Sequence, residues 1–166
     1  MSQNAADIAG TAPDEAKQRV ADTIVYVGGV GFAATLPGKL RLKDVSIGRN
    51  AEEPSKKEAR VVCEVIVDED MLNVNRVMHG ACMAFFIDIC GTLPMIALPG
   101  LSGVSLNLNV SCHAPAKLGD KLIIITTTLA NGARAMSARG EIWNISTKRL
   151  VASGVLIKME PSPPKL

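Results

Sequence analysis

Hydrophobic and polar positions follow two different patterns along this chain, and the changes of pattern divide it into elements. Short alternating stretches bounded by turn residues are typical of half-buried strands, and a long apolar run is typical of a buried helix. We therefore expect two helices, at Pro13–Tyr26 and Gly80–Leu98, and strands at Lys39–Ile47, Val61–Val67, Val104–Cys112, Lys121–Leu129, Ala133–Ile145 and Leu150–Met159.

Less regular segments bound these elements. Pro13, followed by two acidic residues, is favoured in a first helical turn, so the first helix should begin there. Residues 1–12 before it are expected to be disordered, and the proline-rich tail 160–166 to be flexible. The polar stretch Gly48–Arg60 is interpreted as a surface loop. The chain is thus expected to hold a single domain over residues 13–159.

The second helix is apolar on every side, although Gly91 and Pro94 should kink or shorten it. A helix of this kind has to be covered by other elements. The remaining strands follow one another through short turns, which favours an antiparallel sheet that wraps the helix. The sequence therefore predicts an α+β fold with a long central apolar helix.

One full charge, Asp88, lies near the middle of this apolar segment. A buried carboxylate without a partner costs several kcal/mol or becomes neutral, so a fold retains one only where something compensates for it. Asp88 is therefore the first candidate for chemistry. The alternative is that it is hydrogen-bonded to neighbouring backbone in the core.

Composition narrows the possible classes of protein. The 166 residues are 48% hydrophobic and 20% charged with a net charge of +2, which suits a globular domain. The charges form no basic run, so we expect no nucleic-acid partner, and no segment suggests membrane insertion. The N-terminus lacks the apolar region of a secretory signal. The four cysteines fall on apolar segments without a CxxC pair, so we expect free thiols rather than disulfides or metal ligands.

The stretch NVNRVMHGACMAFFID, residues 73–88, resembles the signature of the hotdog-fold acyl-CoA thioesterase family. The resemblance is to the branch that contains the phenylacetate-pathway thioesterase and thioesterase superfamily member 2. Asn73, His79, Gly80 and Asp88 match the motif, and Ala81 replaces its second glycine but keeps the backbone N–H.

A second segment extends the likeness. The stretch GVSLNLNVSCHAPAKLGDKL is similar to the next strand and turn of the family, and it places Ser105 on the serine that accompanies the acid. The alternative is that Ser105 belongs to a polar row on the outer face of a strand. The resemblance implies a hotdog fold, in which a curved antiparallel sheet wraps a long central helix. It also implies a thioester hydrolase that works as a homodimer or as a dimer of dimers.

Thioester hydrolysis needs hydrogen-bond donors for the oxyanion and a carboxylate or other base. Gly80 stands where the helix begins, so its backbone N–H has no intrahelical partner, and Asn73 can add a side-chain amide. Asp88 would be the general base or nucleophile, and Ser105 could hold the water or the acid. His79 is expected to orient the turn before the helix and is left out of the catalytic set.

The helix separates these groups within one chain. Eight residues at about 1.5 Å each place Gly80 and Asp88 about 12 Å apart, too far to meet at one carbonyl. Two central helices that lie antiparallel across a two-fold axis would bring Asp88 of one subunit to Gly80 of the other. We therefore expect two composite sites per dimer, an arrangement that the resemblance also implies.

Coenzyme A carries phosphates, which need basic partners. Lys117, Arg134 and Arg139 lie in or near turns after the central strands and are candidates, although charges in turns are usually solvated. No metal and no cofactor are expected to take part.

Two alternative functions stay open, and so does the location in the cell. A non-catalytic acyl-CoA-binding hotdog protein would share the fold. An enoyl-thioester hydratase would need a paired Asp and His, and neither His79 nor His113 has an acid at that spacing. The cytoplasm is the expected location. The peroxisome is the alternative, because the C-terminal Pro164-Lys165-Leu166 is a variant of the S-K-L address.

Overall fold

The computed structural model describes residues 2–29, 31–99, 103–132 and 134–160. Both expected helices and all expected strands are present, with ends that shift by a few residues. In chain order the elements are η1 (Ala5–Asp7), α1 (Asp14–Tyr26), η2 (Pro37–Lys39), β1 (Arg41–Arg49), β2 (Lys57–Ile66), η3 (Glu69–Met71), α2 (Gly80–Ala97), β3 (Val104–Cys112), β4 (Lys121–Asn131), β5 (Ala135–Asn144) and β6 (Arg149–Met159), where η marks a single turn of 3-10 helix.

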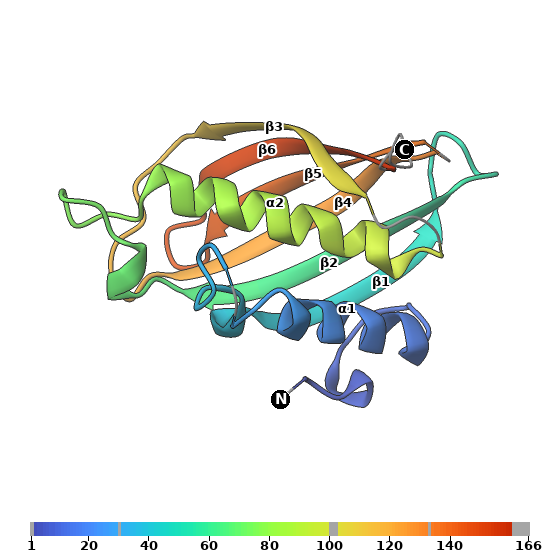
Figure 1. Ribbon diagram of the computed structural model, residues 1–166, viewed down its shortest axis with the longest axis horizontal. Helices are drawn as coiled ribbons and strands as arrows, with labels where there is room; N and C mark the ends of the chain where they lie inside the picture. The colour runs from blue at the N-terminus through green and yellow to red at the C-terminus, as the bar shows by residue number, and fades with distance from the viewer. Residues whose placement is uncertain (1, 30, 100–102, 133, 161–166) are drawn as a thin grey trace, which may run out of the picture.

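The strands form one antiparallel sheet in the order β1-β2-β4-β5-β6-β3. The sheet curves around α2, which lies along its concave face, and α1 lies beside α2 next to β1 (Figure 1). The expected α+β architecture is confirmed. The polar loop is shorter than expected, because Arg49 already pairs with Lys57 at the end of the β1–β2 hairpin.

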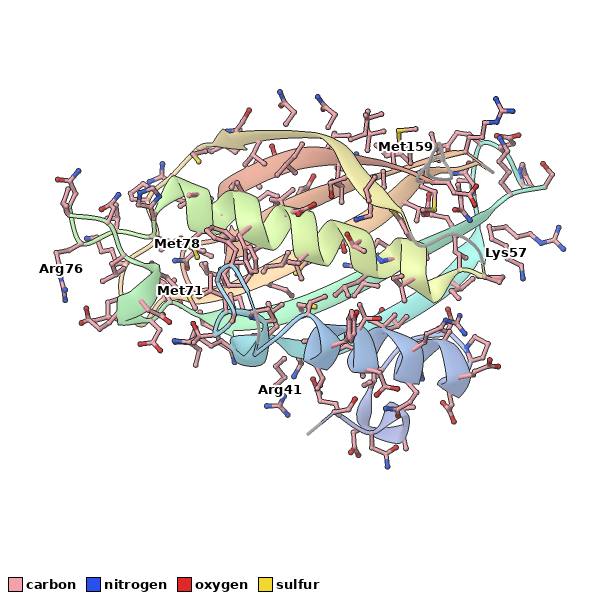
Figure 2. All side chains as sticks on the ribbon, in the orientation of Figure 1. Arg41, Lys57, Met71, Arg76, Met78 and Met159 are labelled. Atoms are coloured by element: carbon pink, nitrogen blue, oxygen red, sulfur yellow. The ribbon has the colours of Figure 1, made fainter. Side chains whose placement is uncertain are left out.

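Side chains of α2 and the sheet fill the space between them (Figure 2). Phe86, Ile87 and Leu93 of α2 are fully buried, as are Ile124 and Ile142 of the strands beneath. The mean hydropathy of α2 is 1.7, which would also suit a membrane span, but 56% of the helix is buried inside the fold, as in a core helix.

The expectation that Gly91 and Pro94 would kink or shorten this helix is wrong as to its length, because α2 runs through both residues to Ala97. Proline cannot donate to the carbonyl four residues earlier, which is that of Cys90. The hydroxyl of Thr126 on β4 donates to this carbonyl instead, at 2.9 Å. A contact with the sheet thus supplies the hydrogen bond that the proline removes.

The N-terminal segment, expected to be disordered, is instead ordered along the free edge of β1. The backbone N–H of Ala9 donates to the carbonyl of Lys43, and the N–H of Val45 donates to the carbonyl of Ala9. The side chain of Gln3 bonds both backbone groups of Leu42. The segment is ordered by a tertiary contact, because the edge strand offers backbone hydrogen-bond partners. The polar composition of the segment does not reveal such partners.

Candidate active site

The N-terminus of α2 presents one free backbone donor. His79 is the N-cap residue, and its Nδ1 accepts the N–H of Ala81 at 3.0 Å. The carbonyl of His79 accepts the next two N–H groups, those of Cys82 and Met83. Among the described residues, the N–H of Gly80 has no hydrogen-bond partner. His79 therefore satisfies the first turn except for the donor of Gly80.

Space in front of this donor is open. Gly80 is exposed, and of the described residues a Cβ added to it would meet only Cys112, whose Sγ would lie 3.7 Å away. Cys112 is a free, exposed thiol, whereas the other cysteines are free and buried. The absence of a side chain at Gly80 thus leaves room for a substrate carbonyl to reach its N–H.

Asn73 lies in the turn before the helix with its side chain held in place. Its Oδ1 accepts the N–H of Asn75 at 2.9 Å and that of Val77 at 3.3 Å. Among the described residues, the side-chain amide nitrogen has no partner. Asn73 is therefore a turn residue that also offers an oriented donor, so the structural and functional interpretations of this residue are compatible.

Asp88 and Ser105 meet in space although α2 and β3 are separate elements. The hydroxyl of Ser105 donates to Oδ1 of Asp88 at 2.9 Å. Asp88 is half-buried, and Ser105 is exposed. The carboxylate on the apolar helix thus has a polar partner within its own chain, supplied by the adjacent strand.

A β-bulge turns Ser105 toward Asp88. Ser105 pairs with Lys158, but Asn107 pairs with Ile157, so Leu106 is the additional residue. Without the bulge, alternation along β3 would place Ser105 and Asn107 on the same face of the strand, the outer one. Bulges often redirect a side chain next to an active site, and here one separates Ser105 from the polar row that follows it.

Lys158 is a third member of this cluster, and it lies outside both sequence motifs. Its Nζ donates to the Oγ of Ser105 at 3.3 Å. Burial lowers the pKa of Lys158, and the nearby Asp88 opposes that shift. Lys158 is two residues after Leu156 on β6, so both side chains lie on the same face of the strand. Leu156 is fully buried, so this is the face toward α2. A lysine at an inward position was the signal in the sequence that could have revealed it.

The predicted catalytic residues thus form two groups along α2. Gly80 and Asn73 lie at its start, and Asp88 and Ser105 lie farther along. Because the helix is continuous from Gly80 to Ala97, the rise of about 1.5 Å per residue keeps the two groups about 12 Å apart along the axis.

The candidate coenzyme A contacts are dispersed. Lys117 is exposed and pairs with Val77, close to the start of α2. Arg139 is exposed on β5 between Ala138 and Gly140, which both face α2. Its side chain therefore lies on the opposite face of the sheet, away from α2. Arg134 lies in the turn between β4 and β5. Of the three, only Lys117 lies next to the segment that carries Asn73.

An apolar cavity of about 260 Å³ adjoins the start of α2. Phe32 and Phe85, two of its lining residues, meet edge to face with ring centroids 6.0 Å apart. The lining residues are Phe32, Ala33, Leu36, Asp70, Met71, Leu72, His79, Ala81, Cys82 and Phe85. His79 and Ala81, the two chain neighbours of Gly80, are thus part of the lining, whereas Gly80 itself is not.

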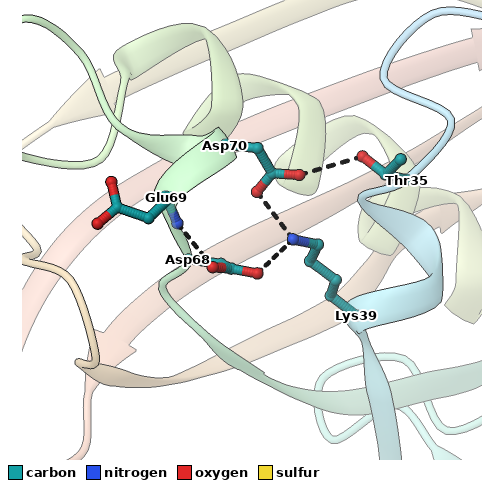
Figure 3. A network of polar contacts seen from close by, with 5 residues as sticks. All are labelled: Thr35, Lys39, Asp68, Glu69 and Asp70. Carbon is teal, nitrogen blue, oxygen red and sulfur yellow. Dashed lines mark hydrogen bonds and ion pairs between the residues drawn. The ribbon is translucent and has the colours of Figure 1, made fainter.

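One wall of this cavity is held by a charged network (Figure 3). Lys39 of η2 contacts the carboxylates of Asp68 and Asp70, and Thr35 donates to Asp70 at 3.2 Å. These bonds raise the pKa of Lys39 and lower that of Asp68. The network ties the loop that carries Phe32 to the segment that leads to Asn73.

Comparison with known proteins decides the family. The Thioesterase superfamily profile matches residues 75–151. Human acyl-coenzyme A thioesterase 13 is 30% identical over 101 residues, which cover 60% of this chain and 72% of that protein. The chain belongs to the thioesterase superfamily.

Solved structures of thioesterases have the same fold as this superfamily member. Thioesterase superfamily member 2 from Mus musculus superposes with a TM-score of 0.69 at 25% identity, over 87% of this chain and 96% of that one. A hypothetical thioesterase from Streptococcus pneumoniae, solved with coenzyme A, superposes with a TM-score of 0.62 at 21% identity, over 77% and 90% of the two chains. The hotdog fold expected from the motif is confirmed.

Proposed function

We propose that this chain hydrolyses the thioester bond of acyl-CoA to a free acid and coenzyme A, at a site that two copies form together. The observation that carries the proposal is the hydrogen bond from Ser105 to Asp88 on the same helix that presents the free N–H of Gly80. Membership of the thioesterase superfamily and the likeness to human acyl-coenzyme A thioesterase 13 support this reaction.

The geometry assigns a task to each group. The N–H of Gly80 and the side-chain amide of Asn73 donate to the thioester oxygen as it gains negative charge. Asp88 either takes a proton from the attacking water or attacks the carbonyl itself. Ser105, bonded to one carboxylate oxygen, fixes the orientation of Asp88. Coenzyme A leaves as the thiol, and no cofactor enters these steps.

Two copies are needed because the oxyanion donors of Asn73 and Gly80 lie too far from Asp88 in the same chain to act on one carbonyl. The chain covers the outer edge of β1 with its own N-terminal segment. Among the described residues nothing pairs with the outer edge of β3. Val104, Leu106 and Leu108 are 53%, 61% and 38% exposed on this strand. An open edge with apolar side chains favours a second copy as its partner, and a two-fold axis there supports antiparallel α2 helices.

Substrate contacts follow from what lies around Gly80. The cavity that Phe32 and Phe85 help to line is largely apolar and includes both chain neighbours of Gly80, so it suits the acyl group next to the thioester. Lys117 lies close to the same end of α2 and suits a phosphate of coenzyme A. The pneumococcal neighbour, which was solved with coenzyme A, supports this ligand class.

A thiol-release assay across acetyl-, medium-chain, long-chain and aryl-CoA tests this function. We expect release of free thiol with at least one of these substrates. Tight binding of acyl-CoA without thiol release would favour a non-catalytic binding protein. Hydration of an enoyl-CoA without thiol release would favour a hydratase.

We propose the cytoplasm as the location, with the peroxisome as the alternative. The residues on which the alternative rests, Pro164-Lys165-Leu166, lie outside the described residues. A fluorescent protein fused to the N-terminus leaves this C-terminus free. Diffuse fluorescence would support the cytoplasm, and punctate fluorescence that coincides with a peroxisomal marker would support the alternative.

A further inference from the structure

Lys158 is a charged side chain on the side of the sheet that faces α2, where it lies beside the apolar Met136 and Leu156. In register it pairs with Ser105 on one side and with the buried Met136 on the other. Two residues back along β6, Leu156 is fully buried. A lysine is rarely retained in such surroundings unless its charge has a partner.

We propose that Lys158 is a positioning residue of the thioesterase site, which holds the Ser105 hydroxyl as a donor to Asp88 and brings a positive charge close to the only acid on α2. This inference rests on the proposed function, because it assigns Lys158 a part in that reaction. The ammonium acts through Ser105 and is not itself required to touch the substrate.

The hydrogen-bonding capacity of the three groups fixes the direction of the chain of bonds. A lysine ammonium can only donate, and a serine hydroxyl has a single proton to give. Because Ser105 accepts from Lys158 at 3.3 Å, its own proton is free to go to Oδ1 of Asp88, 2.9 Å away. Without the ammonium, the hydroxyl could rotate and donate elsewhere.

Within the described part of the chain, Lys158 forms no ion pair, and its only side-chain hydrogen bond is to Ser105. Around it α2 presents Asp88, β3 presents Ser105 and β5 presents the apolar Met136. Burial lowers the pKa of Lys158 while Asp88 favours its charged form, as expected when the two charges sense each other.

The arrangement also depends on the bulge at Leu106. Without that additional residue, Ser105 would not lie opposite Lys158 on the inner face of β3. Three elements thus converge, because α2 supplies the acid, β3 the hydroxyl and β6 the cation. The hydroxyl and the cation explain how the apolar helix α2 can retain the carboxylate of Asp88 within a single chain.

The test is Lys158→Met, which keeps the length and packing of the side chain but removes its charge. We expect kcat to fall about tenfold, the scale of one charge-assisted hydrogen bond, while KM changes by less than about twofold. The acidic limb of the kcat/KM profile should move to higher pH by about half a unit or more. Lys158→Arg should keep the acidic limb close to its wild-type position, because arginine retains the positive charge.

Lys57→Met is the matched control. Lys57 is an exposed lysine at the start of β2, so this variant has the same net charge but an unchanged site. It should leave kcat and the acidic limb as in wild type. A fall in kcat for Lys158→Met without movement of the limb would indicate a structural role only and overturn the inference. Should Lys158→Met fail to fold, Lys158→Gln provides a second uncharged variant.

A readout that needs no turnover separates this inference from the proposed function. The carboxyl carbon of Asp88 can be followed by carbon NMR in aspartate-labelled protein, with its signal assigned from Asp88→Asn. At neutral pH the chemical shift of this carbon should differ between Lys158→Met and wild type by more than it differs between Lys57→Met and wild type. Equal shifts in all three proteins would overturn the inference. Failure of the wild type to release thiol from any acyl-CoA would instead overturn the proposed function.

Discussion

The hydroxyl of Ser105 donates to Oδ1 of Asp88 at 2.9 Å, across the gap between the edge strand and the central helix. The bond leaves the second carboxylate oxygen of Asp88 available. In the proposed reaction that oxygen acts on water or on the thioester carbonyl, so the chemistry depends on the charge of Asp88 and on its orientation.

Asp88→Asn should therefore fold and bind acyl-CoA normally but turn it over at least about a hundredfold more slowly, the scale of a lost positioned base. The amide oxygen of asparagine can still accept the bond from Ser105, so the packing is retained. Steady-state thiol release, together with a thermal melt, measures both properties. Near-normal turnover would remove Asp88 from the mechanism.

Gly80→Val should lower turnover by about tenfold or more, because the branched side chain crowds the free N–H that stabilises the oxyanion. Gly80→Ala should cause a smaller loss, since an added Cβ lies at an ordinary contact distance of 3.7 Å from the Sγ of Cys112. Both rates are compared per folded site. A valine variant that loses stability but keeps its turnover would show that the N–H of Gly80 does not bind the substrate oxygen.

Thr126→Val should destabilise the fold by about 1–3 kcal/mol, because it leaves the buried carbonyl of Cys90 without a donor. Pro94→Ala restores a backbone N–H at that place in α2, so the same threonine change should cost less in that background. Urea unfolding of the two single variants and the double variant measures this coupling. Strictly additive free energies of unfolding would mean that Thr126 does not compensate for Pro94.

Lys39→Met should detach the loop that carries Phe32, with a small loss of stability at neutral pH, because the charges are largely exposed. Since the network lowers the pKa of Asp68, its contribution is present above the ordinary aspartate value of 3.8 and is lost as pH falls through the lower folded value. The difference in unfolding free energy between wild type and variant should thus shrink in acid. A difference that grows as pH falls would contradict this network.

The elements could be predicted from sequence because their signals are local. Alternation located the strands, and the apolar run located α2. The continuation of α2 past Pro94 could not be predicted, because it depends on Thr126 of a strand more than thirty residues later. The ordered N-terminal segment likewise depends on the edge of β1.

The same distinction applies to the candidate site. The motif located Asn73, Gly80 and Asp88, since their spacing lies within one stretch of chain. Ser105 could be named from the resemblance, but not the bulge that turns it inward. Lys158 was missed because its partner is a strand neighbour 53 residues away.

Subunit mixing tests the composite site most directly. Asn73→Ala and Asp88→Asn are each expected to be inactive as homodimers. A mixed dimer would hold one site with both residues intact and one with neither. Random refolding of the two variants together should therefore restore about a quarter of wild-type activity, and a mixed dimer isolated through two different tags should reach about half. An isolated mixed dimer as inactive as its parents would contradict the account, because Asn73 and Asp88 would then not meet across the two-fold axis.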